Sequence, residues 1–114
     1  LNTISGEFAS VSGGYLGAAS GMCTSVSGGY FNQASGAYAS VSGGESGVAS
    51  GVDASVSGGE FNHAAGYDCS VSGGYHNLAQ DTTGGDDSFA SVSGGHGLTS
   101  DTRYGWAGGT YHTP

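Results

Sequence analysis

The sequence predicts an all-β fold, a parallel β-solenoid (β-roll) made of 15-residue coils with two short strands each. The pentapeptide Ser-Val-Ser-Gly-Gly occurs six times, and four of the five intervals between copies are 15 residues long. Within each copy the side chains alternate with a period of two, which is typical of a strand. Glycines recur at fixed places between the alternating stretches, so the chain is expected to turn there once every half repeat.

The first strand of each coil covers an Ala-Ser-Val-Ser-Gly stretch, as in residues 9–13. The alternation places Ala9, Val11 and Gly13 inside the coil, and Ser10 with Ser12 outside. The Gly-Gly pair, followed two residues later by Asn or Gly, predicts the first corner, because Gly and Asn tolerate the positive φ of a sharp turn. These Asn or Gly positions are Gly17, Asn32, Gly47, Asn62 and Asn77.

A second short strand follows the corner and contains one alanine in register in each coil. A second corner comes after it, at another recurring glycine. The alanines are Ala19, Ala34, Ala49, Ala64 and Ala79, and the glycines are Gly21, Gly36, Gly51 and Gly66. Two strands and two corners complete one coil, so equivalent residues of successive coils are expected to form columns about 4.8 Å apart.

The spacing of the repeats divides the chain into residues 1–104, which are the β-roll repeats, and residues 105–114, which are a capping segment. The last interval between copies is 21 residues, so we expect a loop insertion at residues 80–87. A shortened copy begins at Gly105. In it Trp106 takes the position of the repeated valine, and we expect its burial to cap the last coil.

Each coil contributes only about one valine and two alanines to the interior. Burial of so little apolar surface does not offset the conformational entropy that the coil loses on folding. Glycine supplies 25 of the 114 residues, and the apolar fraction is 36%. Hydrogen bonds between coils and packing against other chains must therefore stabilise the fold. We expect self-association, as a homotrimer or a filament.

The charge of the chain argues against several partners. Arg103 is the single Lys or Arg against nine acidic residues, and the net charge is −8. Such a chain is not expected to bind nucleic acid, and no apolar stretch is long enough for membrane insertion. The many serines have no repeated partnership with a histidine and an acid, so we do not expect an enzyme, and no cofactor is expected.

The repeat S-V-S-G-G-x-x-N-x-A-x-G-x-x-A, most complete in residues 25–39, resembles the head repeats of trimeric autotransporter adhesins. That resemblance implies a left-handed β-roll in which three chains associate around a common axis. Similar repeats also occur in phage tail fibres and other secreted fibrous proteins. The resemblance therefore implies an extracellular or cell-surface location, with a virion fibre as the alternative.

Aromatic residues at the predicted corners are the candidate contacts for a ligand or partner. Rings on a surface otherwise rich in Ser and Gly offer contact area to a sugar or to a protein. Alternatively, the rings pack on one another or across a subunit interface, as the small core requires. The candidates are Tyr15, Tyr30, Phe31, Phe61 and Tyr75 in the stripe after Gly-Gly, which also holds Glu45 and Glu60, and Tyr38 in a second stripe just before each strand.

Serines form a second candidate surface. A row of hydroxyls can carry O-linked glycan, or the serines can simply pack tightly and form a ladder up the stack. The candidates are Ser10, Ser25, Ser40, Ser55, Ser70 and Ser91.

Asp81, Asp86 and Asp87 in the insertion are weak candidates for calcium binding, since hard cations prefer carboxylate oxygens. A solvated acidic loop is the simpler interpretation, because the spacing matches no known calcium loop. The four histidines occupy different repeat positions, so no metal site is expected from them.

Two functions remain open on these observations. The first is an extracellular fibrous adhesive or receptor-binding module that contacts a host-surface protein or glycan. The second is a purely structural filament subunit, O-glycosylated or not, or a phage-type tail-fibre segment without a ligand of its own.

Overall fold

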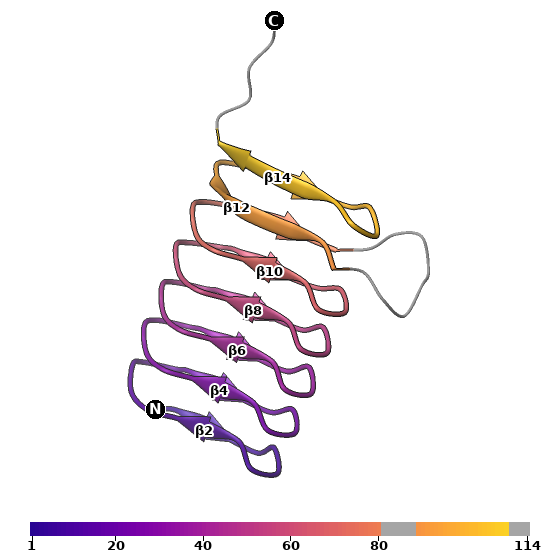
Figure 1. The fold of residues 1–114 in the computed structure, drawn as a ribbon. Coiled ribbons are helices and arrows are strands. Elements are labelled where there is room, and N and C mark those ends of the chain that lie inside the picture. The colour runs from indigo at the N-terminus through magenta and orange to yellow at the C-terminus, as the bar shows by residue number, and fades with distance from the viewer. Residues whose placement is uncertain (81–88, 110–114) are drawn as a thin grey trace, which may run out of the picture.

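The structure, a computed structural model, describes residues 1–80 and 89–109, and in these residues it contains two parallel sheets of seven strands each. Figure 1 shows the coils stacked one on another. The first sheet contains β1 (Thr3–Ile4), β3 (Ala18–Ala19), β5 (Gln33–Ala34), β7 (Val48–Ala49), β9 (His63–Ala64), β11 (Leu78–Ala79) and β13 (Thr99–Ser100). The second contains β2 (Ser10–Val11), β4 (Ser25–Val26), β6 (Ser40–Val41), β8 (Ser55–Val56), β10 (Ser70–Val71), β12 (Ser91–Gly95) and β14 (Trp106–Gly109). The predicted parallel β-solenoid is confirmed.

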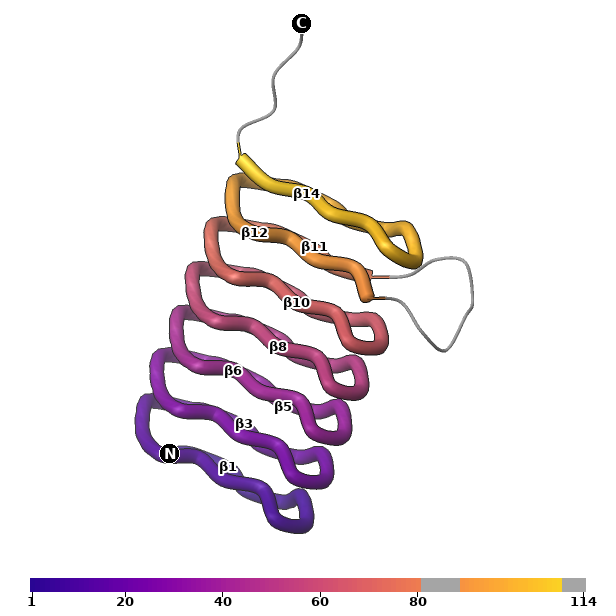
Figure 2. Tube along the Cα trace, viewed as in Figure 1, coloured from indigo at the N-terminus to yellow at the C-terminus, as the bar shows by residue number. Residues whose placement is uncertain are grey.

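Each strand pairs with the equivalent strand of the next coil. Val26, for example, lies opposite Val11 on one side and Val41 on the other, which is a step of 15 residues. The 21-residue step from Val71 to Val92 keeps the same register, so the longer repeat is accommodated without moving a strand. Figure 2 shows each coil as a flattened loop with a sharp corner at either end.

The interior between the two sheets holds the valines and alanines that the alternation predicted. The inward position predicted for Gly13 is wrong, because a Cβ there would meet only Ser27 O, at 3.9 Å, and in the equivalent Gly43 it would meet nothing within 4 Å. Valine is the largest apolar side chain that is fully buried, and alanine, with Thr24 and Cys69 in two coils, fills the other inward positions. The buried valines are Val26, Val41, Val56, Val71 and Val92. The buried alanines are Ala19, Ala34, Ala39, Ala49, Ala54, Ala64, Ala79 and Ala90. Ser100 continues the alanine column of the first sheet, and its Oγ has no hydrogen-bond partner within the described residues.

The corners differ from the sequence prediction in where the positive φ angles lie. At the first corner the second glycine of each pair has positive φ, from 81° to 92° in residues 14, 29, 44, 59 and 74. The next positive φ falls at the residue before the Asn or Gly, for example 54° at Phe31, and not at Asn32. At the second corner it falls at Tyr38 (φ 60°) and not at Gly36. Gly36 is needed for a different reason, because a Cβ there would collide with the backbone of Gly51 in the next coil.

The asparagines predicted as turn formers are buried inside the first corner. Asn62 Nδ2 donates to the carbonyl oxygens of Gly58 and Gly74, at 2.8 and 2.9 Å, and Asn62 Oδ1 accepts from the backbone N–H of Asn77 at 2.9 Å. Asn32 and Asn77 make equivalent bonds in their own coils. The amide satisfies backbone groups that the turn buries, and this explains a polar residue in the interior.

The predicted position of Trp106 is wrong by one residue. Trp106 pairs with Ser91 and Ala107 pairs with Val92, so the alanine takes the valine column and Trp106 points outward from the serine column. The alignment on Gly-Gly is right only at Gly95 and Gly109, because a register irregularity between Val92 and Gly95 absorbs one residue. Trp106 is 69% exposed, and its Nε1 donates to Ser93 Oγ at 2.7 Å. An interior sized for valine has no room for an indole ring.

The predicted capping segment therefore begins as part of the fold, since β14 is the last strand of the second sheet. The remainder of the segment, residues 110–114, lies outside the described residues.

Trp106→Ser is expected to change the free energy of unfolding by no more than about 0.5 kcal/mol, as for other exposed positions. Val92→Ser in the adjacent coil is the control and should cost several times more, because it buries a hydroxyl and removes core methyl groups. Urea denaturation of both variants measures the difference. A loss of more than about 2 kcal/mol for Trp106→Ser would mean that the indole is buried after all.

Candidate interaction surfaces

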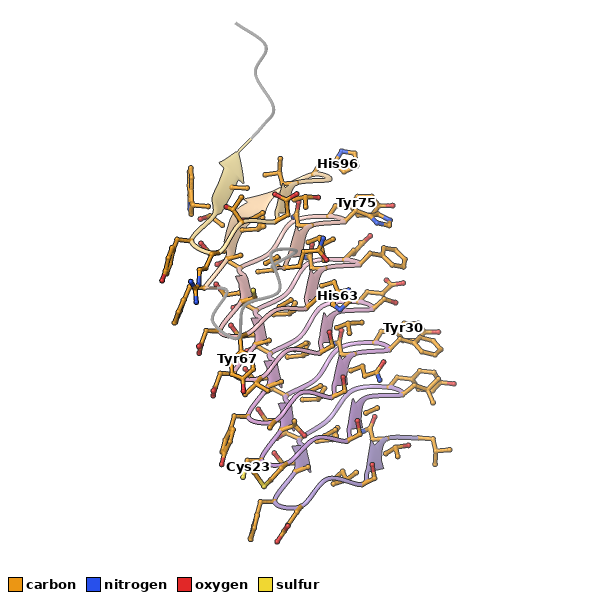
Figure 3. The ribbon with its side chains drawn as sticks, turned by 90° about the vertical axis from the view of Figure 1, so that its right-hand side faces the viewer. Cys23, Tyr30, His63, Tyr67, Tyr75 and His96 are labelled. Atoms are coloured by element: carbon orange, nitrogen blue, oxygen red, sulfur yellow. The ribbon has the colours of Figure 1, made fainter. Side chains whose placement is uncertain are left out.

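The first corner carries a continuous column of side chains along one edge of the solenoid, at the position that follows Gly-Gly. Parallel bridges join each member to the next, which keeps the column in register through all six coils that contribute to it. Its members are Tyr15, Tyr30, Glu45, Glu60, Tyr75 and His96. Figure 3 shows Tyr30, Tyr75 and His96 projecting from this edge.

A second column lies directly beside the first, at the next residue of each coil. Its members are Leu16, Phe31, Ser46, Phe61, His76 and Gly97. All six have positive φ, between 53° and 66°, although only the last is glycine. An L-residue in this left-handed region costs about 1 to 2 kcal/mol. The chain thus keeps side chains here where glycine would be unstrained. Together the two columns are called the Gly-Gly corner below.

The rings of the Gly-Gly corner pack on each other and remain exposed. Tyr15 and Tyr30 are stacked with their centroids 5.2 Å apart, and Tyr30 meets Phe31 edge to face at 4.6 Å. Further along, Phe61 stacks on His76 at 5.0 Å and meets Tyr75 edge to face at 6.0 Å. Each of the four Tyr and Phe residues from Tyr30 onward is nevertheless 40 to 47% exposed. The packing fixes the rings in place without covering them.

Tyr38 does not belong to this surface, in agreement with its place in the stripe just before each strand. It lies at the second corner, on the opposite edge of the flattened coil, where Figure 3 shows Cys23 and Tyr67. The column there contains Phe8, Cys23, Tyr38, Asp53, Asp68, Phe89 and Tyr104. Phe89 and Tyr104 stack with centroids 5.8 Å apart. The structure thus brings together Tyr15, Tyr30, Phe31, Phe61 and Tyr75, and separates Tyr38 from them.

The outer face of the second sheet carries two columns of serine. The candidates Ser25, Ser40, Ser55, Ser70 and Ser91 are half-buried, and Ser10 of the first coil is exposed. The neighbouring column, which begins at Ser12 and ends at Ser93, is exposed throughout. Within residues 1–80 and 89–109, no hydrogen bond joins serine hydroxyls of adjacent coils. The half-buried column therefore contributes through its small size, and the exposed column is the more accessible to a modifying enzyme.

The outer face of the first sheet is more varied, with Ala18, Gln33, Val48, His63, Leu78 and Thr99 in one column. His63 Nε2 and Ser50 Oγ lie 2.7 Å apart on this face. Burial lowers the pKa of His63 below its usual value. A serine and a histidine alone do not make a hydrolytic site, which also needs an orienting acid and an oxyanion hole.

The part of the chain that the structure describes has neither a cluster of metal-ligating side chains nor a pocket. No three His, Cys, Asp or Glu residues converge there. The described residues also contain no helix that could span a membrane. The calcium candidates Asp81, Asp86 and Asp87 lie outside the described residues.

Sequence reasoning missed one feature of the Gly-Gly corner, which is the buried asparagine behind it. Its signal was the way Asn and Gly share one repeat position. The carboxylates Glu45 and Glu60, which interrupt the aromatic column, were evident from the sequence as members of the stripe after Gly-Gly.

Comparison with protein-family models, with curated proteins and with solved structures finds no match to this chain.

Proposed function

We propose that this chain is an adhesive or receptor-binding module of an extracellular fibre, and that the Gly-Gly corner is its contact surface. The observation that carries the proposal is the exposure of a fixed row of aromatic rings along one edge. Aromatic residues dominate the energetics of protein interfaces, because they bury a large area at little entropic cost. The second corner also exposes rings, at Phe8, Tyr38, Phe89 and Tyr104, but among the described residues only Phe89 and Tyr104 stack on each other there.

We propose further that the module associates with copies of itself, as a homotrimer. The support is the small interior, where no apolar side chain larger than valine is fully buried within residues 1–80 and 89–109, and the resemblance of the repeat to trimeric adhesin heads. A parallel solenoid that presents the same Ser-x-Ser pattern in each of six coils offers a regular face for cyclic packing of identical chains. This assembly would repeat the Gly-Gly corner around the fibre and increase avidity for a surface.

The binding proposal is tested by replacing the rings of the Gly-Gly corner with serine. Tyr15, Tyr30, Phe31, Phe61 and Tyr75 are changed together, and binding is measured on cultured animal cells and on a glycan array. We expect at least about a tenfold loss of binding, since each buried aromatic anchor contributes about 1 kcal/mol or more. Sedimentation equilibrium of the parent chain and the variant records the state of assembly, which should be trimeric in both.

The matched control replaces Phe8, Tyr38, Phe89 and Tyr104 at the opposite corner with serine. It removes a similar amount of aromatic surface and should leave binding unchanged. Equal losses in the two variants would contradict the assignment to the Gly-Gly corner. Absence of binding by the parent trimer to every cell type and glycan would favour the structural filament or the tail-fibre segment instead.

A further inference from the structure

The first column of the Gly-Gly corner carries acidic residues in place of aromatic rings in the two central coils. Along the first column the order is Tyr30, Glu45, Glu60 and Tyr75, with neighbouring members joined by parallel bridges. Such neighbours are about 4.8 Å apart. In the second column Ser46 lies between Phe31 and Phe61. Two carboxylates are thus surrounded by four exposed rings.

The negative charge of this pair is not balanced within the described chain. Like charges directly opposite each other on neighbouring strands destabilise a sheet. Neither Glu45 nor Glu60 has a hydrogen bond or an ion pair from its side chain in residues 1–80 and 89–109. Arg103, the single basic residue of the sequence apart from histidines, lies at the opposite corner with its guanidinium 5.8 Å from the Tyr104 ring centroid. The repulsion between the two carboxylates would therefore be relieved by a positively charged group of a binding partner.

The rings around the pair suit the same kind of partner. Lys and Arg are attracted to the faces of Tyr and Phe, and their alkyl stems pack on apolar surface while the charged head stays in contact with carboxylates. Tyr30, Phe31, Phe61 and Tyr75 are all at least 40% exposed. A small divalent cation fits less well, because calcium takes six to eight oxygen ligands and no third ligand converges here.

We propose that the Gly-Gly corner of the two central coils binds a basic segment of a partner protein, with one Lys or Arg side chain on the Glu45–Glu60 pair. This inference rests on the binding role proposed above and specifies the chemistry of the partner. The net charge of −8 would also attract such a partner over a distance. The rings provide the contact area, and the carboxylates select for charge.

The test uses the double variant Glu45→Gln with Glu60→Gln, and the probe is a synthetic peptide of alternating Lys and Ser. Binding is measured by calorimetry at about 150 mM salt, where long-range attraction is screened. We expect the dissociation constant of the variant to be at least about tenfold larger, because the charged contacts to Lys are lost. The melting temperature should not fall, because the substitutions remove the repulsion between the two carboxylates. A peptide with Gln in place of Lys should not bind either protein.

The opposite corner provides the matched control. Asp53 and Asp68 form a second acidic pair in the same two coils, with Tyr38 and Phe89 as their exposed neighbours in that column. Asp53→Asn with Asp68→Asn changes the net charge equally and should weaken binding less than about threefold. Equal losses in the two double variants would mean that the peptide binds both corners alike or follows total charge, and either result would overturn the proposal. Preference for a glucosamine oligomer over the peptide would overturn it too.

The two proposals can fail separately. If the Glu45 and Glu60 variant still adheres to cells and the parent does not bind the Lys peptide, the basic partner is wrong but the adhesive role stands. If the ring variant described above keeps its adhesion, the adhesive role itself is wrong.

Discussion

Gly44→Ala is expected to destabilise the chain by about 3 to 5 kcal/mol, which is at the upper end of single substitutions. Gly44 has φ 89°, a conformation that an alanine enters only with strain. A Cβ at Gly44 would also collide with the carbonyl oxygen of Gly59 and approach its nitrogen to 2.9 Å. Those atoms belong to the backbone of the next coil, where Gly59 O accepts the N–H of Glu45. Relieving the collision therefore means breaking the ladder between two coils.

The preceding residue is the control. Gly43 has no positive φ, and a Cβ there would meet nothing within 4 Å. Gly43→Ala should change stability by no more than about 0.5 kcal/mol. Urea denaturation of the two variants, followed by far-ultraviolet circular dichroism, measures both values. Equal destabilisation would show that the first glycine is also required, which no contact within the described chain explains.

Asn62→Ala is expected to cost about 3 kcal/mol of unfolding free energy. The substitution removes the partner that Asn62 supplies to the buried N–H of Asn77 and to the part-buried carbonyl oxygen of Gly58. Each unsatisfied buried group costs about 1 to 3 kcal/mol. Gly74 O is less affected, because it also accepts the N–H of Glu60.

Asn2→Ala tests the same column where water has access. Asn2 Oδ1 accepts from the N–H of Gly17 at 2.9 Å, and its Nδ2 donates to Gly13 O and Gly14 O at 3.3 Å, but Asn2 is exposed. Water can replace these bonds, so the loss should stay below about 1 kcal/mol. Thermal denaturation of the two variants compares them. If Asn2→Ala loses as much unfolding free energy as Asn62→Ala, burial does not explain the cost of removing the asparagine.

Much of the fold was predictable because equivalent residues of successive repeats occupy the same structural position, so each position is represented several times in the sequence. The alternation around Val26 and Val41 identified the inward positions, and the alanine column identified the second strand. Trp106 was misplaced because the last copy is irregular, so an alignment on Gly-Gly and an alignment on the strand differ by one residue there. Because the sequence contains only one irregular copy, the repeat pattern did not show which of the two alignments is right.

The candidate surface was predictable only in part. The repeat distinguished the residues after Gly-Gly from the stripe before each strand that holds Tyr38, but it did not show which rings stack on one another. The structure separates the two edges, since the chain reverses between Phe31 and Tyr38. It also places Ser46 between the two phenylalanine rings, next to Glu45.

The sequence by itself determined the architecture, the 15-residue coil and the composition of the interior, because local alternation and a fixed repeat length leave one way to stack the strands. Only the tertiary structure decided which glycine of each pair is indispensable, where asparagine lies and which rings stack on one another. These depend on contacts between residues about 15 positions apart, such as Gly44 with Gly59 or Asn62 with Asn77. A turn preference describes one residue and its chain neighbours, whereas the stacked coil adds the backbone of the next turn, and that added contact determines which substitution the corner tolerates.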